Sequence, residues 1–352
     1  MHPLLYIPFQ RREGNSGPSR FRQNLKRHLA LQKIPYLKKP DKAKILFFPT
    51  SCPIEMIEKV KANGGRVIQR LDGVYYPSKH GEGFEVFNAV ARKIYCNYAD
   101  FVVFQSNYSK EQCFSMFGDK PDSKYRIICN GADTKYFYPA LKMNTIQSNK
   151  RVRLITTGYF RNLDMLEPVI KACDVLKDTF NLELVVLGPI NNEGLIAYSQ
   201  RNYITHKKTT KLHVLANELR KSHIFIYSHL NPPCPNSVVE AISCGLPVVG
   251  FDSGAMRELL PFGIDLLAWV SNDLFQKYED FKFEKLAEKI SFAIEKYAIV
   301  KERAMAHSHL YPFDECGEKY ISLFSRMHQE LNKGNVDENR IYAEHVTGMS
   351  RR

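Results

Sequence analysis

The chain has 352 residues, of which 44% are hydrophobic and 25% are charged, so it is long and apolar enough to bury the cores of two globular domains. The sequence shows no run of about 18 apolar residues and no leader in which a charged stretch precedes an apolar one. It therefore predicts neither a membrane span nor a secretory signal, and we expect a cytosolic protein or one at a membrane surface. Eight scattered cysteines without a C-x-x-C pair favour structural thiols over a disulfide framework or a zinc site.

The net charge of +13 is concentrated near the start of the chain. Residues 1–44 hold eleven Lys and Arg residues against Glu13 and Asp41, a net charge of +9. A solvated face that aids solubility is the simplest explanation, and peripheral contact with an anionic membrane or a phosphorylated acceptor is the next. The stretch lacks the regular aromatic residues of a base-stacking groove, so we do not expect nucleic acid as a partner.

Residues 1–141 alternate short apolar runs with helical segments, taken here in chain order. The apolar runs are PLLYIPF, ILFFPT, RVIQRL, DFVVFQS and YRIICNG. Between them, apolar spacing predicts helices over residues 19–31, 53–62, 83–95 and 108–117. This βα repeat predicts a first domain built on a doubly wound parallel sheet.

The polar segment 142–150 reads as a linker, after which the βα pattern begins again over residues 151–312. Its apolar runs are RVRLITTG, LELVVLG, HIFIYSH, LPVVGF and IDLLAWV. A helix over residues 313–331 with one apolar face follows, and we expect it to pack back toward the first domain. Residues 332–352 form a polar tail that we expect to be weakly ordered. The predicted fold is α/β, with two Rossmann-like domains facing across a cleft where ligands bind.

Several catalytic motifs are absent. The sequence has no Asp-x-Asp pair, no H-E-x-x-H and no Cys/His cluster at ligand spacing, so no metal site is expected. It also lacks G-x-G-x-x-G after the first strand, a P-loop and a G-x-S-x-G elbow. Dehydrogenases, kinases and hydrolases are therefore not the leading interpretations.

Three motifs, in the correct order, carry a family resemblance. "PSRFRQNLKRHLA" resembles the first helix, "IICNGADTKYFYP" the end of the N-terminal domain, and "CPNSVVEAISCGLPVV" with "SGAMREL" the donor-binding segment of family 4 glycosyltransferases. These are retaining enzymes that use nucleotide sugars and have the GT-B fold. The resemblance spans most of residues 3–330. It implies transfer of a sugar from a nucleotide diphosphate, with UDP or GDP expected, to an acceptor hydroxyl, without a cofactor or metal.

The resemblance places the nucleotide ribose on Glu240, whose carboxylate would accept both ribose hydroxyls. The local alternative is a capping box, in which Ser237 caps a helix and Glu240 binds a backbone N–H. Gly254 would open a second anion cradle or, alternatively, an ordinary turn. The expected donor-binding residues are Gly17, Gly158, Gly188, His206, Ser228, Pro235, Asn236, Ser237, Glu240, Gly254, Ala255 and Met256.

Two departures from the family pattern concern the donor site. The family often has a pair of glutamates, and Glu240 matches the second, whereas Pro232 occupies the position of the first. The donor-side basic pair is also altered, and Arg161 is the nearest match to it. We expect Arg161 to stabilise the pyrophosphate leaving group.

On the acceptor side, the predicted residues are Arg70, Asp72, Ser106 and Asn107. Asp72 would orient or deprotonate the acceptor hydroxyl, although an Asp-Gly turn is an alternative for it, and Ser106 is also a good helix N-cap. The predicted catalytic residues are thus Asp72, Arg161 and Glu240. The expected acceptor is a glycan, a lipid-linked saccharide or another glycoconjugate. The alternatives are a DNA-modifying glycosyltransferase and a catalytically silent GT-B-like binding protein, which Pro232 would suit.

Overall fold

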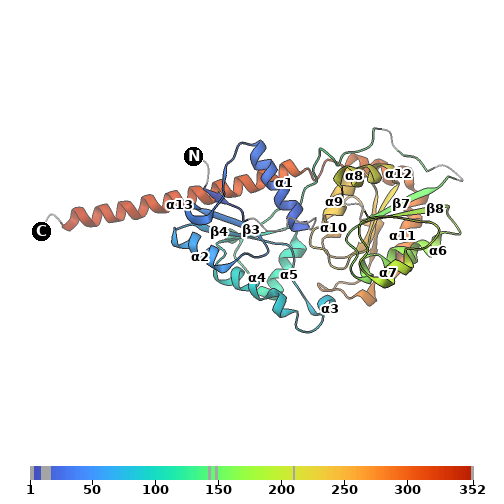
Figure 1. Cartoon of the computed structure of the whole chain (residues 1–352), viewed down its shortest axis with the longest axis horizontal. Helices are drawn as coiled ribbons and strands as arrows, with labels where there is room; N and C mark the ends of the chain where they lie inside the picture. Colours follow the sequence, from blue (N-terminus) through green and yellow to red (C-terminus); the bar gives the residue numbers. More distant parts are fainter. Residues whose placement is uncertain (1–3, 9–16, 142–143, 147–149, 209–210, 350–352) are drawn as a thin grey trace.

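The computed structural model describes residues 4–8, 17–141, 144–146, 150–208 and 211–349, with residues 333–349 as backbone only. It contains two parallel six-stranded sheets, each in its own domain, and the two domains lie side by side (Figure 1). The predicted α/β fold class is confirmed. None of the described helices combines the length and the apolar content that crossing a bilayer requires.

The N-terminal sheet has the strand order β2-β1-β3-β4-β5-β6. Its strands are β1 (Leu5–Tyr6), β2 (Tyr36–Leu37), β3 (Ile45–Pro49), β4 (Arg66–Leu71), β5 (Phe101–Phe104) and β6 (Tyr125–Ile127). Its helices are α1 (Gly17–Leu31), α2 (Ile54–Ala62), α3 (Pro77–His80), α4 (Glu85–Asn97) and α5 (Asn107–Phe117). Strand β2 was not predicted, because two residues of an edge strand leave no measurable apolar period.

Both faces of this sheet are buried, as the continuous apolar runs predict for a parallel sheet. In β3, Ile45 and Phe47 face a core that includes α1, whereas Leu46 and Phe48 face a core that includes α2. The period of two along the strand sends alternate side chains to opposite faces. The doubly wound arrangement follows from this division.

The C-terminal sheet has the strand order β12-β11-β10-β7-β8-β9. Its strands are β7 (Val152–Thr157), β8 (Leu182–Leu187), β9 (Ile204–Lys207), β10 (Ile224–Tyr227), β11 (Val248–Asp252) and β12 (Leu267–Trp269). Its helices are α6 (Glu167–Leu176), α7 (Glu193–Tyr198), α8 (Leu212–Lys221), α9 (Asn236–Ser243), α10 (Met256–Leu259), α11 (Phe283–Glu295) and α12 (Tyr297–Ala306). Helices α6 and α11 contribute to the core on one face, and α8 and α9 to the core on the other.

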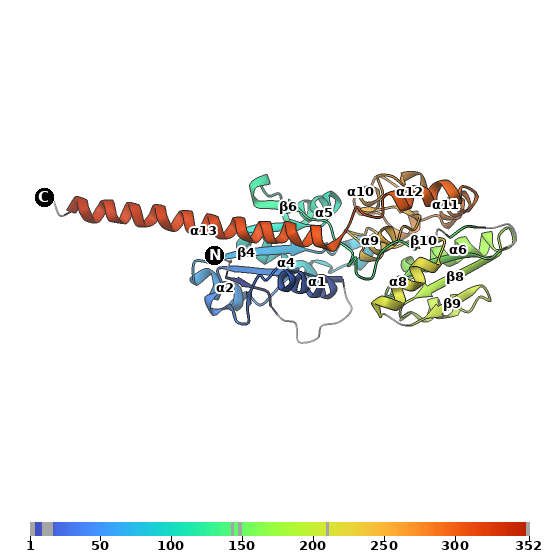
Figure 2. The same cartoon turned by 90° about the horizontal axis from the view of Figure 1, so that it is seen from above.

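The last helix, α13 (Phe313–Met349), returns to the N-terminal domain and runs along it (Figure 2). Tyr320 and Phe324 each place a ring centroid 5.3 Å from that of Phe47 in β3. The sequence places the end of this helix at Leu331, but the structure continues it to Met349. The prediction of a separate polar tail is therefore wrong over residues 332–349, because polar residues lower apolar periodicity without breaking a helix when Pro is absent.

The chain crosses between the domains twice, and the two crossings are hydrogen-bonded to each other. The Ala132 N–H donates to the Tyr311 carbonyl at 2.8 Å, and the Phe313 N–H donates to the Ala132 carbonyl at 2.8 Å. Gly131 allows this approach, since a Cβ there would lie 2.6 Å from the Phe313 Cα. The crossings therefore form one compact connection.

The loop after β10, residues 229–235, forms much of the contact between the domains. The Ser106 hydroxyl donates to the Pro233 carbonyl at 2.6 Å, and the Asn231 amide donates to the Tyr76 hydroxyl at 2.9 Å. Nearby, the Glu258 carboxylate accepts the backbone N–H groups of Asn107 and Tyr108 at the start of α5, at 2.8 and 2.7 Å. An acid at a helix N-terminus interacts favourably with the helix dipole, so this contact joins the domains across the rim of the cleft.

Candidate functional site

A cavity of about 540 Å³ lies between the domains, where the carboxyl ends of both sheets meet. Its walls come from the residues that follow β4, β5 and β6 on one side and β7, β8 and β10 on the other, together with the starts of α1 and α9. Ligands of doubly wound folds bind at this end of the strands. Ten residues of the predicted site line it: Gly17, Arg70, Asp72, Gly158, Arg161, Gly188, Pro235, Asn236, Ser237 and Glu240.

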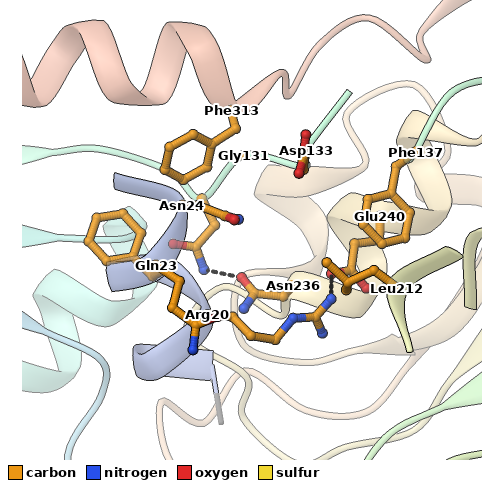
Figure 3. A pocket seen from close by; sticks show the side chains of 12 residues that line it. Arg20, Gln23, Asn24, Gly131, Asp133, Phe137, Leu212, Asn236, Glu240 and Phe313 are labelled. Carbon is orange, nitrogen blue, oxygen red and sulfur yellow. Dashed lines mark hydrogen bonds and ion pairs between the residues drawn. The ribbon is translucent and has the colours of Figure 1, made fainter. Parts of the chain in front are cut away.

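Glu240 lies on α9, is 5% exposed, and points from the C-terminal domain toward α1. Its Oε1 accepts a hydrogen bond from Arg20 Nη2 at 2.6 Å, across the domain boundary (Figure 3). The capping-box alternative is wrong, because the N-cap of α9 is Pro235, one residue before the helix begins, and it makes no side-chain cap. Glu240 therefore makes no capping contact, and its carboxylate lines the cavity.

Glu240 has an oxygen that is available to accept hydrogen bonds and a raised pKa. Its Oε2 has no hydrogen-bond partner among the described residues. Burial raises the pKa of the carboxyl to about 6, and the Arg20 guanidinium opposes the shift. A buried oxygen without a partner costs free energy in the empty protein, and a pair of neighbouring hydroxyls would remove that cost.

The floor of the cavity is formed by two glycines at the ends of neighbouring strands. Gly188 has φ of +128°, and a Cβ there would lie 1.9 Å from the Gly158 carbonyl oxygen. Gly158 in turn lies against His229, whose Nε2 would be 3.3 Å from a Cβ at position 158. These positions thus need glycine for backbone approach, which also keeps the floor open to a ligand.

A chain of polar contacts connects the acceptor-side residues to the start of α9. Arg70 forms an ion pair with Asp72 and donates to Asn130 Oδ1 at 2.7 Å. Asn130 Nδ2 donates to Asn236 Oδ1 at 2.8 Å, and Gln105 Nε2 donates to Asp72 Oδ1 at 2.6 Å. Burial raises the pKa of Asp72, and Arg70 opposes the shift. The carboxylate and the helix start are therefore held in one rigid network.

The predicted cradle at Gly254, Ala255 and Met256 lies outside the described cavity lining. Gly254 has φ of +59°, but a Cβ there would lie 2.4 Å from the Pro232 carbonyl oxygen, and the Ala255 N–H donates to that same oxygen at 2.8 Å. The following helix, α10, has four residues, too few for a strong dipole. In this structure the turn packs against the backbone of Pro232, and a donor contact at Gly254, Ala255 and Met256 stays a prediction.

Four other predicted residues also lie outside the described lining of the cavity. Ser228 donates to the Asp164 carbonyl at 3.0 Å, and His206 Nε2 lies 2.8 Å from the carbonyl oxygen of Gly188. Both side chains therefore contact the backbone near the cavity and are not part of its described lining. Ser106 is the N-cap of α5 and accepts the Ser109 N–H, and Asn107 binds Glu258. The structure thus gives these four residues structural contacts around the site.

Arg161 stands at the rim of the cavity and is exposed, with its guanidinium 4.4 Å from the centroid of the Tyr159 ring. Stacking on an aromatic ring fixes the plane of a guanidinium while leaving its N–H groups to bind an anion. This geometry is compatible with the expected role beside a leaving group.

The sequence analysis missed two groups of the cavity. Lys79, on α3, donates to the Leu230 carbonyl at 3.2 Å, and burial lowers the pKa of its ammonium. His229 stacks on Tyr227 with centroids 4.5 Å apart, and burial with Lys79 nearby lowers its pKa to about 3, so it is neutral at pH 7. No local pattern marks either residue. Among the described residues, no three or more His, Cys, Asp or Glu side chains are arranged to hold a metal ion.

Comparison with known proteins gives a match to a family model for part of the chain. Residues 151–295 match the family model described as Glycosyl transferases group 1. A probable sucrose-phosphate synthase of Thermosipho melanesiensis is 26% identical over 264 residues, which cover 67% of this chain and 56% of that protein. The match thus spans little more than half of that relative's length.

Solved structures match over nearly the whole chain. The sucrose-phosphate synthase of Thermosynechococcus elongatus has a TM-score of 0.69 at 14% identity, covering 94% of this chain and 100% of that one. HepE of Anabaena, solved in complex with UDP and glucose, has a TM-score of 0.67 at 12% identity, covering 93% and 100%. This chain therefore has the GT-B fold, and its residues 151–295 match the family model Glycosyl transferases group 1.

Proposed function

We propose that this protein is a retaining glycosyltransferase, which moves a sugar from a nucleotide diphosphate to an acceptor hydroxyl. The observation that carries the proposal is Glu240, a buried carboxylate with an unpartnered oxygen in a cavity between two Rossmann-like domains. A ribose diol offers two adjacent O–H donors, which suit one carboxylate. Support comes from HepE, whose structure contains UDP and glucose.

On the donor side, the start of α9 would bind phosphate. Asn236 and Ser237 line the cavity at the first turn of this helix, where backbone N–H groups have no partner within the helix. Arg161 would stabilise the charge that develops on the pyrophosphate as the sugar leaves. UDP or GDP is the expected nucleotide. Arg161 and the backbone N–H groups at the start of α9 would stabilise its charge without a metal.

On the acceptor side, Asp72 would receive the acceptor hydroxyl. Its side chain is 15% exposed, and its Oδ2 has no partner among the described residues. Because Arg70 and Gln105 hold the other oxygen, Asp72 is better placed to orient the hydroxyl than to move during the reaction. Retention then follows from attack on the same face as the departing diphosphate, as the family resemblance implies.

The acceptor is proposed to be a glycan, a lipid-linked saccharide or another glycoconjugate, reached from the cytosol or a membrane surface. Lys38 and Lys39 are exposed and would contribute to contact with anionic lipid. Arg11 and Arg12, which belong to the same basic stretch of residues 1–44 and would share this contact, lie outside the described residues.

The test is a turnover screen of UDP- and GDP-sugars with free glycans, lipid-linked saccharides and duplex DNA as acceptors. We expect nucleotide release that depends on a saccharide acceptor, with NMR showing the donor's anomeric configuration in the product. Transfer to duplex DNA alone would instead support a DNA-modifying enzyme, and inversion of the anomer would refute the retaining mechanism.

One observation favours a second candidate, a catalytically silent binding protein. Pro232 replaces the acid that the family often places near the donor sugar, and its carbonyl occupies the Gly254 turn. Such a protein would bind the nucleotide through Glu240 yet release none. Nucleotide binding by calorimetry with no turnover of any donor would favour it.

A further inference from the structure

Two cysteines from different domains meet beside the cavity. Cys129 follows β6 in the N-terminal domain, and Cys234 lies in the loop after β10 in the C-terminal domain. Their sulfur atoms are 3.4 Å apart. A disulfide bond has an S–S length of about 2.05 Å, so the two sulfurs need to approach each other by only about 1.4 Å.

We propose that Cys129 and Cys234 are a modification site, at which a peroxide converts two thiols into a disulfide that fastens the two domains together. The sequence suggests structural roles for all eight cysteines, but the structure sets this pair apart, because its two members come from different domains and their sulfur atoms are in contact. Nothing in the residue spacing predicts the pairing, since 105 positions separate the two cysteines.

Hydrogen bonds from the N-terminal domain hold the Cys234 segment next to Cys129. The Cys234 carbonyl accepts a hydrogen bond from Asn130 Nδ2 at 2.9 Å, and Asn130 is the residue after Cys129. One residue before Cys234, the Pro233 carbonyl accepts the Ser106 hydroxyl at 2.6 Å. The Pro233 and Cys234 carbonyls are therefore both anchored to the N-terminal domain, next to the two sulfur atoms.

A small oxidant can reach the pair through the cavity, and the pKa values of the two thiols are shifted in opposite directions. Cys234 is one of the residues that line the cavity, and Cys129 is partly exposed. The hydrogen bond from Cys129 lowers the pKa of Cys234, and the same contact together with burial raises the pKa of Cys129. Cys234 lines the cavity and is the thiol that a peroxide in the cavity meets, so it is assigned as the nucleophile and Cys129 as the resolving thiol.

The reaction balances with hydrogen peroxide as the oxidant. The Cys234 thiolate attacks one peroxide oxygen, the O–O bond breaks, and a sulfenic acid forms with release of water after protonation. The Cys129 sulfur then attacks the sulfenic sulfur, forms the S–S bond and releases a second water. Overall, two thiols lose two electrons and two protons, and one peroxide becomes two waters.

The bond would act on the enzyme by preventing separation of the domains. A disulfide holds the two Cα atoms within about 7 Å of each other. Substrate entry and product release in enzymes with facing domains require the cleft to open, and often set the turnover rate. The oxidised protein would keep its fold and lose turnover, and a dithiol reductant would restore it.

The experiment uses the full chain, treated with hydrogen peroxide, blocked with N-ethylmaleimide and digested with trypsin without reduction. We expect residues 127–135 to be joined to residues 222–257, with fragment ions that assign the link to Cys234 rather than Cys244. Dithiothreitol should abolish the joined peptide. Cys129→Ser should give none, whereas Cys96→Ser, which removes an exposed thiol on α4, should behave as the parent.

The result that overturns the proposal is peroxide modification of Cys96 while Cys129 and Cys234 both stay free for alkylation. In the parent, turnover should fall by about tenfold or more as the joined peptide accumulates. In Cys129→Ser, turnover should stay near that variant's own reduced value. Full turnover with the link complete would refute the locking role. The peptide is measured without substrate, so failure of the proposed glycosyl transfer leaves this test intact.

Discussion

Replacing Glu240 by Gln tests the central element of the site at almost constant volume. A hydrogen bond to a charged group contributes about 1.5–3 kcal/mol, against about 1 kcal/mol for a neutral one. In the free protein Arg20 already holds Oε1, so a ribose diol gains mainly the interaction at the unpartnered Oε2. In Glu240→Gln the amide oxygen would stay with Arg20 and the amide nitrogen, a donor, would face the diol, so one bond to a charged oxygen is lost. We therefore expect binding of UDP or GDP to weaken by about 1.5–3 kcal/mol, or about 10- to 150-fold in Kd.

The same substitution should leave the fold intact. The raised pKa of Glu240, about 6 against 4.5 for the free side chain, means that its ionised form costs about 2 kcal/mol of stability at pH 7.5. A neutral amide avoids that cost, so Tm should not fall. Isothermal titration calorimetry with each nucleotide measures the affinity, and Glu288→Gln, an exposed acid on α11, is the matched control. A Glu240→Gln protein that binds the nucleotide within about threefold of the parent would remove Glu240 from the ribose site.

The raised pKa of Glu240 also predicts two opposite pH dependences. Between pH 4.5 and about 6 the folded protein holds a proton on Glu240 that the unfolded chain has lost, so this residue's contribution to stability falls as pH rises through that window. Nucleotide affinity should instead fall as pH drops below about 6, because the carboxylate becomes protonated. Calorimetry at several pH values should show neither dependence on this group in Glu240→Gln. Arg161→Ala should lower kcat on the order of a hundredfold with a smaller effect on donor binding, and a kcat within about threefold of the parent would exclude a role in leaving-group departure. Lys38→Gln combined with Lys39→Gln should weaken sedimentation with vesicles of acidic lipid, and equal binding to neutral vesicles would contradict an electrostatic membrane contact.

The regular part of the fold could be predicted because its signals are local. Continuous apolar runs such as Phe101–Phe104 mark parallel strands with two covered faces, and the helices between them show their own apolar spacing. Strand β9 was missed, because Ile204–Lys207 is a half-buried edge strand with a polar sequence. An edge strand is not buried on both faces, so its sequence lacks the continuous apolar run from which a strand can be predicted.

The lining of the cavity could be predicted where a single motif supplies both the polar groups and their framework, as in residues 235–240. It was not predicted where the partner comes from a distant segment. Arg20 meets Glu240 across 220 positions, and the sequence marks Arg20 only as one of many basic residues. The surroundings of the Gly254 turn could not be predicted for a related reason, because its contact with the Pro232 carbonyl depends on the path of residue 232 in space.

The route of α13 has a consequence for how the polypeptide acquires its structure during synthesis. The N-terminal domain leaves the ribosome first, yet part of its core consists of Phe313, Tyr320 and Phe324. The buried core clusters of the C-terminal domain use residues up to Val300 and need none of these side chains. The second domain can therefore complete its core while the first still waits for its last helix, reversing the usual order in which domains fold as they emerge. Until then, the β3 face around Phe47 lacks the cover that Tyr320 and Phe324 give it in the finished protein.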